Sequence, residues 1–370
     1  MSSKETFNNF SNRRKQKAPN LPFVVTDESI YALVGNYLFD NWGVAYLDLS
    51  EYDFSNVSIE AMAKLAFSSS TIWPSEDKLP KGFNPSEILK KCTRTNDIVK
   101  KLHRQGIDGY SITIAVIDNR FQGEQHIEFD NADIVKCTLS NSKINNYHFH
   151  MEDVLAKLCG KNLGIAPKAK VLYYEVSDEE DCSFDVMNAL ESIKDRIING
   201  EKIRAINYSY SLIDEDTPFK YQQECITLVE ELKKLGCELI DSTRFGERFF
   251  CCGTDFLNTY DNINLYKSAS FAKGKSYESE VKNKINILCS GRTILEYCSN
   301  DGYKYEAVDC FSCSIPQCVG YYALCLQLNS KLTFDEFTSL AYNSGDVNDA
   351  GIRVLNIENL IKKIELNNKR

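Results

Sequence analysis

Three side chains, each beside an apolar stretch, could together move a proton. Asp118 follows the apolar run IAVI, His150 precedes the segment MEDVLAKLCG, and Ser312 lies four residues before Pro316 and the apolar stretch that Pro316 opens. A carboxylate, an imidazole and a hydroxyl are the groups that orient a base, accept a proton and attack a carbonyl carbon. The chemistry that such a set predicts is nucleophilic acyl transfer.

Each of the three residues also has a plain structural interpretation. Asp118 could cap a helix or form a turn, His150 could be a structural histidine at a helix start, and Ser312 could be an ordinary N-cap. A helix N-terminus offers free backbone N–H groups and a positive dipole end, which a nucleophile needs beside a developing oxyanion. The combination of all three therefore favours catalysis more than any one of them does.

The elements that must position these residues alternate between strand and helix. Apolar or helix-periodic segments predict strands over SITIAVID, AKVLYYEV, RAINYSYS, CELID and NKINILCSG. They predict helices over EILKKCTRTNDIVKKLHRQG (residues 87–106), HMEDVLAKLCG, DVMNALESIKDRIING, FKYQQECITLVEELKKLG and IPQCVGYYALCLQL. Such alternation indicates βαβ units and an α/β fold, with a mostly parallel sheet between helices on both faces. The carboxyl ends of the strands are then expected to carry the site.

At these motifs the chain resembles the subtilisin-like serine peptidases (subtilases, peptidase family S8). The order Asp, His, Ser is the order found in subtilisin. VIDNRF resembles the family's aspartate motif, HMEDVLAKLCG its histidine helix, GIAPKAKVLYYEV a turn and strand, and YEAVDCFSCSIPQCVGYYAL its serine motif, with Pro316 and Gly320 in place. Counting from His150 places Val154 and Ala156 on the core side of the helix, whereas counting from His148 would place charged residues there. The resemblance covers about residues 86–366.

The resemblance implies a subtilisin-like three-layer fold and a triad of Asp118, His150 and Ser312. Ser312 would attack a peptide carbonyl, His150 would take its proton, and Asp118 would orient the imidazole. The partner expected is a peptide or protein substrate bound in extended form, paired with the strand that ends near Ser209 and Tyr210. No cofactor is expected to be required; calcium is common in the family, but no clear carboxylate loop supports it here.

The sequence departs from the family pattern at several cleft positions. The stretch CELIDSTRFGE has no Asn where the family has its side-chain oxyanion donor; counting places Phe245 there, beside Thr243 and Arg244. Further departures are Asn119-Arg120 after the aspartate, Asp153 in place of a second His, Ser211 in place of a glycine, and Cys310-Phe311 before the nucleophile. These changes predict a crowded cleft and selective processing. The alternative is a pseudoprotease that serves as a binding or regulatory module.

Composition sets the remaining expectations. The chain has 370 residues, a net charge of −9 and 14 Cys, and its polar start shows no secretory signal. These features predict reduced, buried thiols in a cytoplasmic protein with no nucleic-acid or membrane partner. A nucleotide-binding α/β protein is disfavoured because no Gly-rich phosphate loop is present. We expect a disordered tail over residues 1–20, an extension or propeptide-like segment with a linker over 21–85, and the peptidase domain over 86–370.

Overall fold

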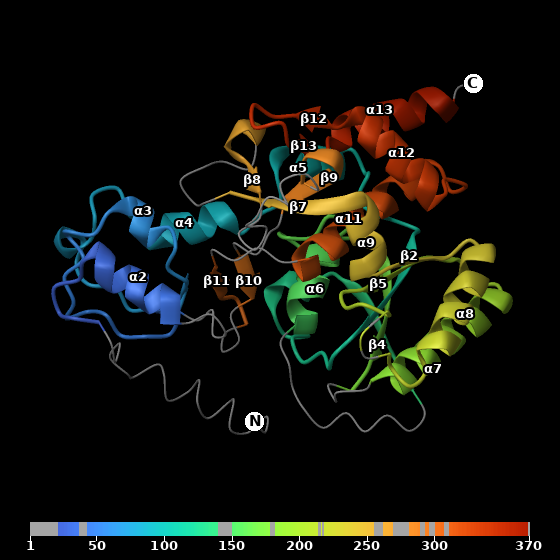
Figure 1. The fold of residues 1–370 in the computed structure, drawn as a ribbon, viewed down its shortest axis with the longest axis horizontal. Helices are drawn as coiled ribbons and strands as arrows, with labels where there is room; N and C mark the ends of the chain where they lie inside the picture. Colours follow the sequence, from blue (N-terminus) through green and yellow to red (C-terminus); the bar gives the residue numbers. More distant parts are fainter. Residues whose placement is uncertain are drawn as a thin grey trace. The chain divides into compact units, whose positions relative to one another are not determined.

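In the computed structural model the chain forms two compact units (Figure 1). The smaller unit comprises Met1–Arg94, Asp255–Thr259 and Ser290–Asp309, and the larger comprises Thr95–Thr254, Tyr260–Cys289 and Cys310–Arg370. The structure describes residues 21–36, 43–139, 150–177, 182–213, 216, 218–254, 262–268, 281–288, 293–295, 300–306 and 311–368. The triad residues that the sequence predicts all belong to the larger unit.

The smaller unit is built around a short antiparallel sheet and an aromatic core. Its strands are β1 (Phe67–Ser68), β11 (Tyr303–Tyr305) and β10 (Thr293–Leu295), and its helices are α2 (Asp27–Asn36), α3 (Ile59–Met62), η1 (Glu76–Lys78) and α4 (Pro85–Cys92). Trp73 and Phe83, from the stretch predicted as a linker, pack their rings against Phe67. That stretch is packed because its two aromatic side chains join the core. The segment around β10 and β11, far along the chain, belongs to this unit because it pairs with β1.

The larger unit contains the parallel sheet that the sequence predicts. Its strand order is β3 (Asp133–Cys137), β4 (Lys170–Glu175), β2 (Thr113–Asp118), β5 (Ile203–Tyr208) and β6 (Glu238–Ile240), and every neighbouring pair is parallel. In the central strand Ile117 is opposite Tyr174 on one side and Tyr208 on the other. Asp118 therefore emerges at the carboxyl end of the most central strand, which both neighbours hold in place.

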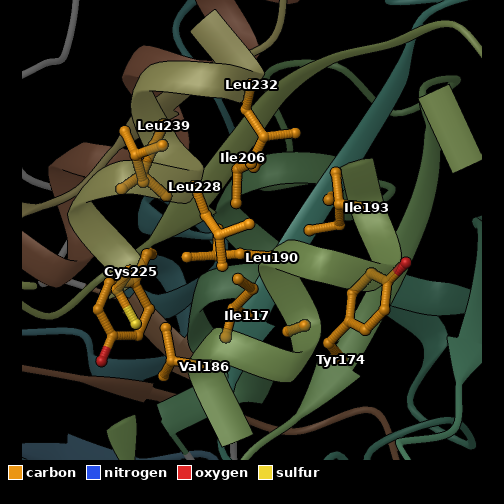
Figure 2. Close-up of a cluster of buried hydrophobic side chains, with 14 of the residues drawn as sticks. Ile117, Tyr174, Val186, Leu190, Ile193, Ile206, Cys225, Leu228, Leu232 and Leu239 are labelled. Carbon is orange, nitrogen blue, oxygen red and sulfur yellow. The ribbon is translucent and has the colours of Figure 1, made fainter. Parts of the chain in front are cut away.

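Helices cover both faces of this sheet, as predicted (Figure 1). On one face α7 (Ser183–Ile198) and α8 (Gln222–Lys234) bury an apolar core against the strands, and Figure 2 shows Ile117, Leu190 and Leu228 within it. On the other face lie α6 (His150–Cys159) and α11 (Phe311–Leu328). Successive side chains of a strand point to opposite faces. Because Ile117 faces α7 and α8, Asp118 faces the side of α6.

A second, mixed sheet completes the larger unit. Its order is β12 (Asp346–Val347), β13 (Arg353–Val354), β9 (Ile285–Leu288), β7 (Phe249–Gly253) and β8 (Lys267–Ser268). The parallel strands of the chain are thus divided between two sheets, and α9 (Ser242–Arg248) separates β6 from β7 along the chain. The remaining elements are α5 (Asp97–Arg104), η2 (Ile127–Phe129), η3 (Ile263–Leu265), α12 (Phe334–Ser344) and α13 (Ile357–Asn368). In the described part of the chain, no helix is both long and apolar enough to cross a membrane.

Two predicted element boundaries are wrong. The single helix expected over residues 87–106 is two helices, α4 and α5, because the Thr93 hydroxyl donates back to the Leu89 carbonyl and Asn96 caps a new helix at the Val99 N–H. The helix expected to open near Ile315 already begins at Phe311, so Pro316 lies inside α11. Since proline lacks an N–H, the Ser312 carbonyl loses its usual helical partner.

The glycine of the serine motif lets α11 pack closely on the turn after α6. A Cβ built on Gly320 would lie 2.6 Å from the Cβ of Ile165, closer than side chains tolerate. The same turn receives the ring of His103, whose Nε2 is 2.8 Å from the Ile165 carbonyl oxygen. Gly320 is therefore required by the approach of two elements, even though glycine weakens a helix interior.

Gly320→Ala should destabilise the larger unit by about 1–3 kcal/mol, because the added methyl overpacks a closed contact. Gly246 in α9 is a matched control, since a Cβ there would meet only the Phe311 ring edge at 3.9 Å. Gly246→Ala should be neutral or stabilising by up to about 1 kcal/mol. Urea unfolding monitored by circular dichroism measures both. Equal stability of Gly320→Ala and the wild type would contradict this packing.

Candidate active site

The structure pairs Asp118 with His150. Imidazole Nδ1 lies 2.9 Å from Oδ1 and 3.0 Å from Oδ2 of Asp118. The carboxylate is fully buried, and its Oδ1 also accepts the N–H of Asn119 at 2.8 Å. An ionised carboxylate can only accept hydrogen bonds, so Nδ1 of His150 must donate to Asp118. The proton of the neutral ring is therefore on Nδ1, and Nε2 is the nitrogen that can accept a proton. An oriented base of this kind is what proton abstraction from a hydroxyl requires.

Two opposing effects set the proton affinity of His150. Burial disfavours the charged ring, but the charge and hydrogen bond of Asp118, with the charges of Asp153 and Glu152, outweigh it and raise the pKa of His150 above 6.5. Asp153 and Glu152 lie in the first turn of α6, where negative charge also favours the helix dipole. Asp153 occupies the position where the family has a second His. The negative charge of Asp153 therefore stabilises the protonated form of His150.

Ser312 lies in the first turn of α11, half-buried and two residues before the fully buried Ser314. Its hydroxyl donates to the backbone carbonyl oxygen of Ser209 at 3.3 Å. Ser209 directly follows β5, the strand next to β2, so Ser312 reaches the same edge of the sheet as Asp118. Asp118 and His150 are thus in direct contact. Ser312 lies at the same edge of the sheet, and its hydroxyl is directed to the backbone carbonyl of Ser209.

Tyr210 forms part of the same site. Its ring lies against the His150 ring, with centroids 5.0 Å apart and planes inclined by 38°, and its hydroxyl donates to the side-chain oxygen of Asn119. The tyrosine therefore extends from the imidazole to the residue after Asp118. The sequence indicates that Tyr210 lies at the end of a substrate-lining strand but not that its ring contacts His150, because nothing in the local pattern says which way the ring turns.

The segment after β5 is held to the start of α9 by several hydrogen bonds. The N–H of Ser242 donates to the Tyr210 carbonyl at 2.8 Å, and the N–H of Leu212 donates to Asp241 at 3.2 Å. The hydroxyls of Ser211 and Thr243 lie 2.7 Å apart. The backbone edge at Tyr210, where an extended substrate is expected to pair, is thus already engaged within the chain.

Phe245 occupies the position where the resemblance implies a donor Asn. It is fully buried, and its ring packs on Phe311 with centroids 5.3 Å apart. Phe311 is also in contact with Phe250 of β7, at the same centroid distance. These aromatic contacts fix the residue before Ser312 and so the start of α11. They supply packing where the family supplies a hydrogen-bond donor.

Two further described histidines, His103 and His126, have structural partners. His126 caps η2 by accepting the Glu128 N–H, while burial lowers the pKa of His103. His148 and Cys310 lie outside the described residues. The described cysteines are free thiols, nearly all buried, and burial with the nearby Glu128 charge raises the pKa of Cys159 to about 12. Within the described ranges, no three His, Cys, Asp or Glu side chains are grouped to hold a metal ion.

Comparison with solved structures identifies the fold. The PatG macrocyclase in complex with peptide superposes with a TM-score of 0.50 at 11% identity, covering 73% of this chain and 98% of that one. Also similar are the prenylagaramide maturation protease PagA (TM-score 0.48, 20% identity, 72% and 98% covered) and the self-cleaved protease domain of PatA (TM-score 0.48, 15% identity, 69% and 97% covered). Neither a family model nor a curated protein sequence matches the chain. The chain therefore has the subtilisin-like fold that its sequence predicts.

Asp118→Asn should lower the pKa of His150, because it removes the negative charge and leaves burial unopposed by its main partner. An NMR titration of the ring C–H signals measures this, and His103, which the change does not touch, should titrate below 6.5 in both proteins. A His150 pKa that is the same in Asp118→Asn and the wild type would contradict the pairing.

The same shift predicts how stability depends on pH. Since the folded-state pKa of His150 is raised, its protonation stabilises the fold fully below pH 6.5, and that contribution is lost as pH rises through the raised value. Asp118→Asn should therefore reduce the free energy of unfolding more at acidic than at alkaline pH.

Proposed function

We propose that this chain is a serine endopeptidase that processes a particular peptide or protein through Asp118, His150 and Ser312. The observation that carries the proposal is the hydrogen bond between His150 and the buried carboxylate of Asp118 at the carboxyl edge of the parallel sheet. A charged carboxylate is costly to bury unless it is hydrogen-bonded. Here its partner is an imidazole at the start of a helix, next to the helix that carries Ser312.

In the proposed reaction the Ser312 oxygen attacks the substrate carbonyl carbon while His150 Nε2 accepts the hydroxyl proton. The resulting tetrahedral intermediate expels the amine, which takes that proton from the imidazolium, and leaves an acyl-enzyme. Water then attacks the ester carbonyl and gives a proton to His150; when the second tetrahedral intermediate collapses, the ester C–O bond breaks, the Ser312 oxygen takes that proton back from His150, and a carboxylic acid is released that ionises in water. Asp118 keeps its charge throughout and stabilises the imidazolium in both halves of the reaction.

This mechanism requires the Ser312 hydroxyl to leave the Ser209 carbonyl and turn toward His150. Rotation about one side-chain bond moves the oxygen between staggered positions and is fast compared with turnover. The bond that it leaves is 3.3 Å long, at the weak end of O–H···O geometry. The contact with Ser209 is therefore compatible with a resting state of the nucleophile.

Two features support selective processing over general digestion. Tyr210 extends over the imidazole to Asn119, and the substrate-lining segment at Tyr210 and Ser211 is bonded to Ser242 and Thr243. A substrate must displace or fit around these groups, so few sequences are expected to bind. The similar fold of the PatG macrocyclase holds a peptide, which supports a peptide as the ligand here.

The second candidate is a pseudoprotease that binds a partner through the same cleft. Two observations favour it: the Ser312 hydroxyl is directed to a backbone carbonyl, and Phe245 replaces a donor with a ring. The peptidase and the pseudoprotease would use the same surface, so the test that distinguishes them is whether the Ser312 hydroxyl reacts as a nucleophile.

A fluorophosphonate probe should label the purified chain at Ser312. Ser312→Ala should abolish labelling and lower peptide cleavage by about 10⁴-fold or more, because the nucleophile is removed. Ser314→Ala is the matched control: its buried hydroxyl has no hydrogen-bond partner among the described contacts, so removing it should leave labelling unchanged. A wild-type chain that is folded but unlabelled would support the binding module instead.

The wild-type chain should leave unfolded casein intact while cutting a small subset of a mixed peptide library analysed by mass spectrometry. Tyr210→Ala should widen that subset, because it removes the ring beside His150. Tyr110→Ala, at a tyrosine that is 69% exposed, should leave the cleavage pattern unchanged. Broad digestion of casein by the wild type would overturn the selectivity.

A further inference from the structure

The proposed reaction needs donors for the negative charge on the substrate oxygen. A first-turn backbone N–H of α11, that of Ser312, offers one. The position expected to supply a side-chain donor holds Phe245, whose ring is fully buried against Phe249 and Phe311. A single missing donor of this kind costs about 10²–10³-fold in kcat. A peptidase with this fold therefore needs another group in the same place.

Polar side chains near Phe245 differ in what they already contact. The guanidinium of Arg244 bonds the Asp241 carboxylate at 3.1 Å, and the hydroxyl of Thr243 is 2.7 Å from that of Ser211. The first contact lies within the start of α9, and the second joins α9 to the segment after β5. Thr243 and Arg244, which the sequence places beside the position of the missing Asn, therefore each have a structural partner.

Ser242 differs from both. Its hydroxyl oxygen is 3.5 Å from the Ser209 carbonyl oxygen, the same atom to which Ser312 donates at 3.3 Å. The two hydroxyls, one from α9 and one from α11, are therefore directed to the same acceptor. A bond of 3.5 Å is at the limit of hydrogen-bond geometry and is given up at little cost.

The backbone holds Ser242 firmly while leaving its hydroxyl free to rotate. Its N–H donates to the Tyr210 carbonyl at 2.8 Å, and Asp241, the residue before it, caps the Arg244 N–H at 2.9 Å. The side chain is half-buried. A donor on a fixed backbone needs little reorganisation when charge develops, which is the property that makes an oxyanion site effective.

We propose that the Ser242 hydroxyl is the side-chain oxyanion donor of this chain, an inference that rests on the proposed peptidase function. When the Ser312 oxygen bonds to the substrate carbon, the π electrons of the carbonyl move onto its oxygen and His150 takes the Ser312 proton. The Ser242 O–H turns from Ser209 to that oxygen and keeps its proton. On collapse the C–N bond breaks, the amine leaves with the proton from His150, and the Ser242 hydrogen bond weakens.

An isosteric pair of variants tests this role. Ser242→Thr keeps the hydroxyl and Ser242→Val has nearly the same shape without it. Steady-state cleavage of a peptide from the library should show kcat in Ser242→Thr within about 5-fold of the wild type and in Ser242→Val about 10²–10³-fold lower, with KM little changed. The acid limb of the pH–rate profile should be the same in both, because the pair of Asp118 and His150 is untouched. Thr227→Val, which loses an exposed hydroxyl on α8 that donates to the Gln223 carbonyl, is the control and should lose little kcat.

The outcomes separate the two proposals. A wild type that cleaves peptides, with Ser242→Val and Ser242→Thr equally active or equally impaired, would overturn the role of Ser242 and leave the peptidase function intact. A folded wild type that neither labels with the fluorophosphonate nor cleaves would overturn the peptidase function, and the donor role with it. Circular dichroism melting of both variants shows whether the hydroxyl affects the fold, since a purely structural role would lower Tm and kcat together in Ser242→Val.

Discussion

The buried carboxylate of Asp118 is the constraint on which the rest of the site depends. It lies at the end of the central strand, fully shielded from solvent, and must be paired to remain charged there. The Asn119 N–H and the imidazole of His150 provide that pairing. The position of α6 is therefore set by an electrostatic requirement as well as by its apolar face, and α11 is brought to the same place by the absence of a side chain at Gly320.

Much of this arrangement is predictable from sequence because it follows from periodicity. The short, β-branched apolar run before Asp118 is typical of a buried strand, and the alternation of strands and helices predicts a parallel sheet whose carboxyl edge collects the polar residues. Gly200 and Gly236 end their helices as expected, both with positive φ. The fold class and the pairing of Asp118 with His150 both emerge from such local signals combined with the resemblance.

What sequence could not predict depends on side-chain direction and on contacts between distant segments. The ring of Tyr210 could face solvent or the imidazole, and its hydroxyl finds Asn119 only after the sheet has formed. Ser242 carries no signal of its own, since a serine after a strand is usually a helix start; its relation to Ser312 appears only through the shared carbonyl of Ser209. Likewise, aligning the sequence with the family pattern shows that Phe245 replaces the donor Asn, but it does not show that the Phe245 ring packs on Phe311.

The Ser209 carbonyl, which receives the hydroxyls of both Ser242 and Ser312, also links the binding of an extended chain to the reactivity of Ser312. An extended chain laid along this strand would compete for backbone groups that two serine hydroxyls now occupy. In a peptidase, docking of the correct chain would therefore free the attacking oxygen and its stabilising neighbour in a single event. Because both contacts are long, a small reactive molecule could displace the hydroxyls as well, so the carbonyl would favour an extended substrate through its fit to the strand and not by blocking the serine.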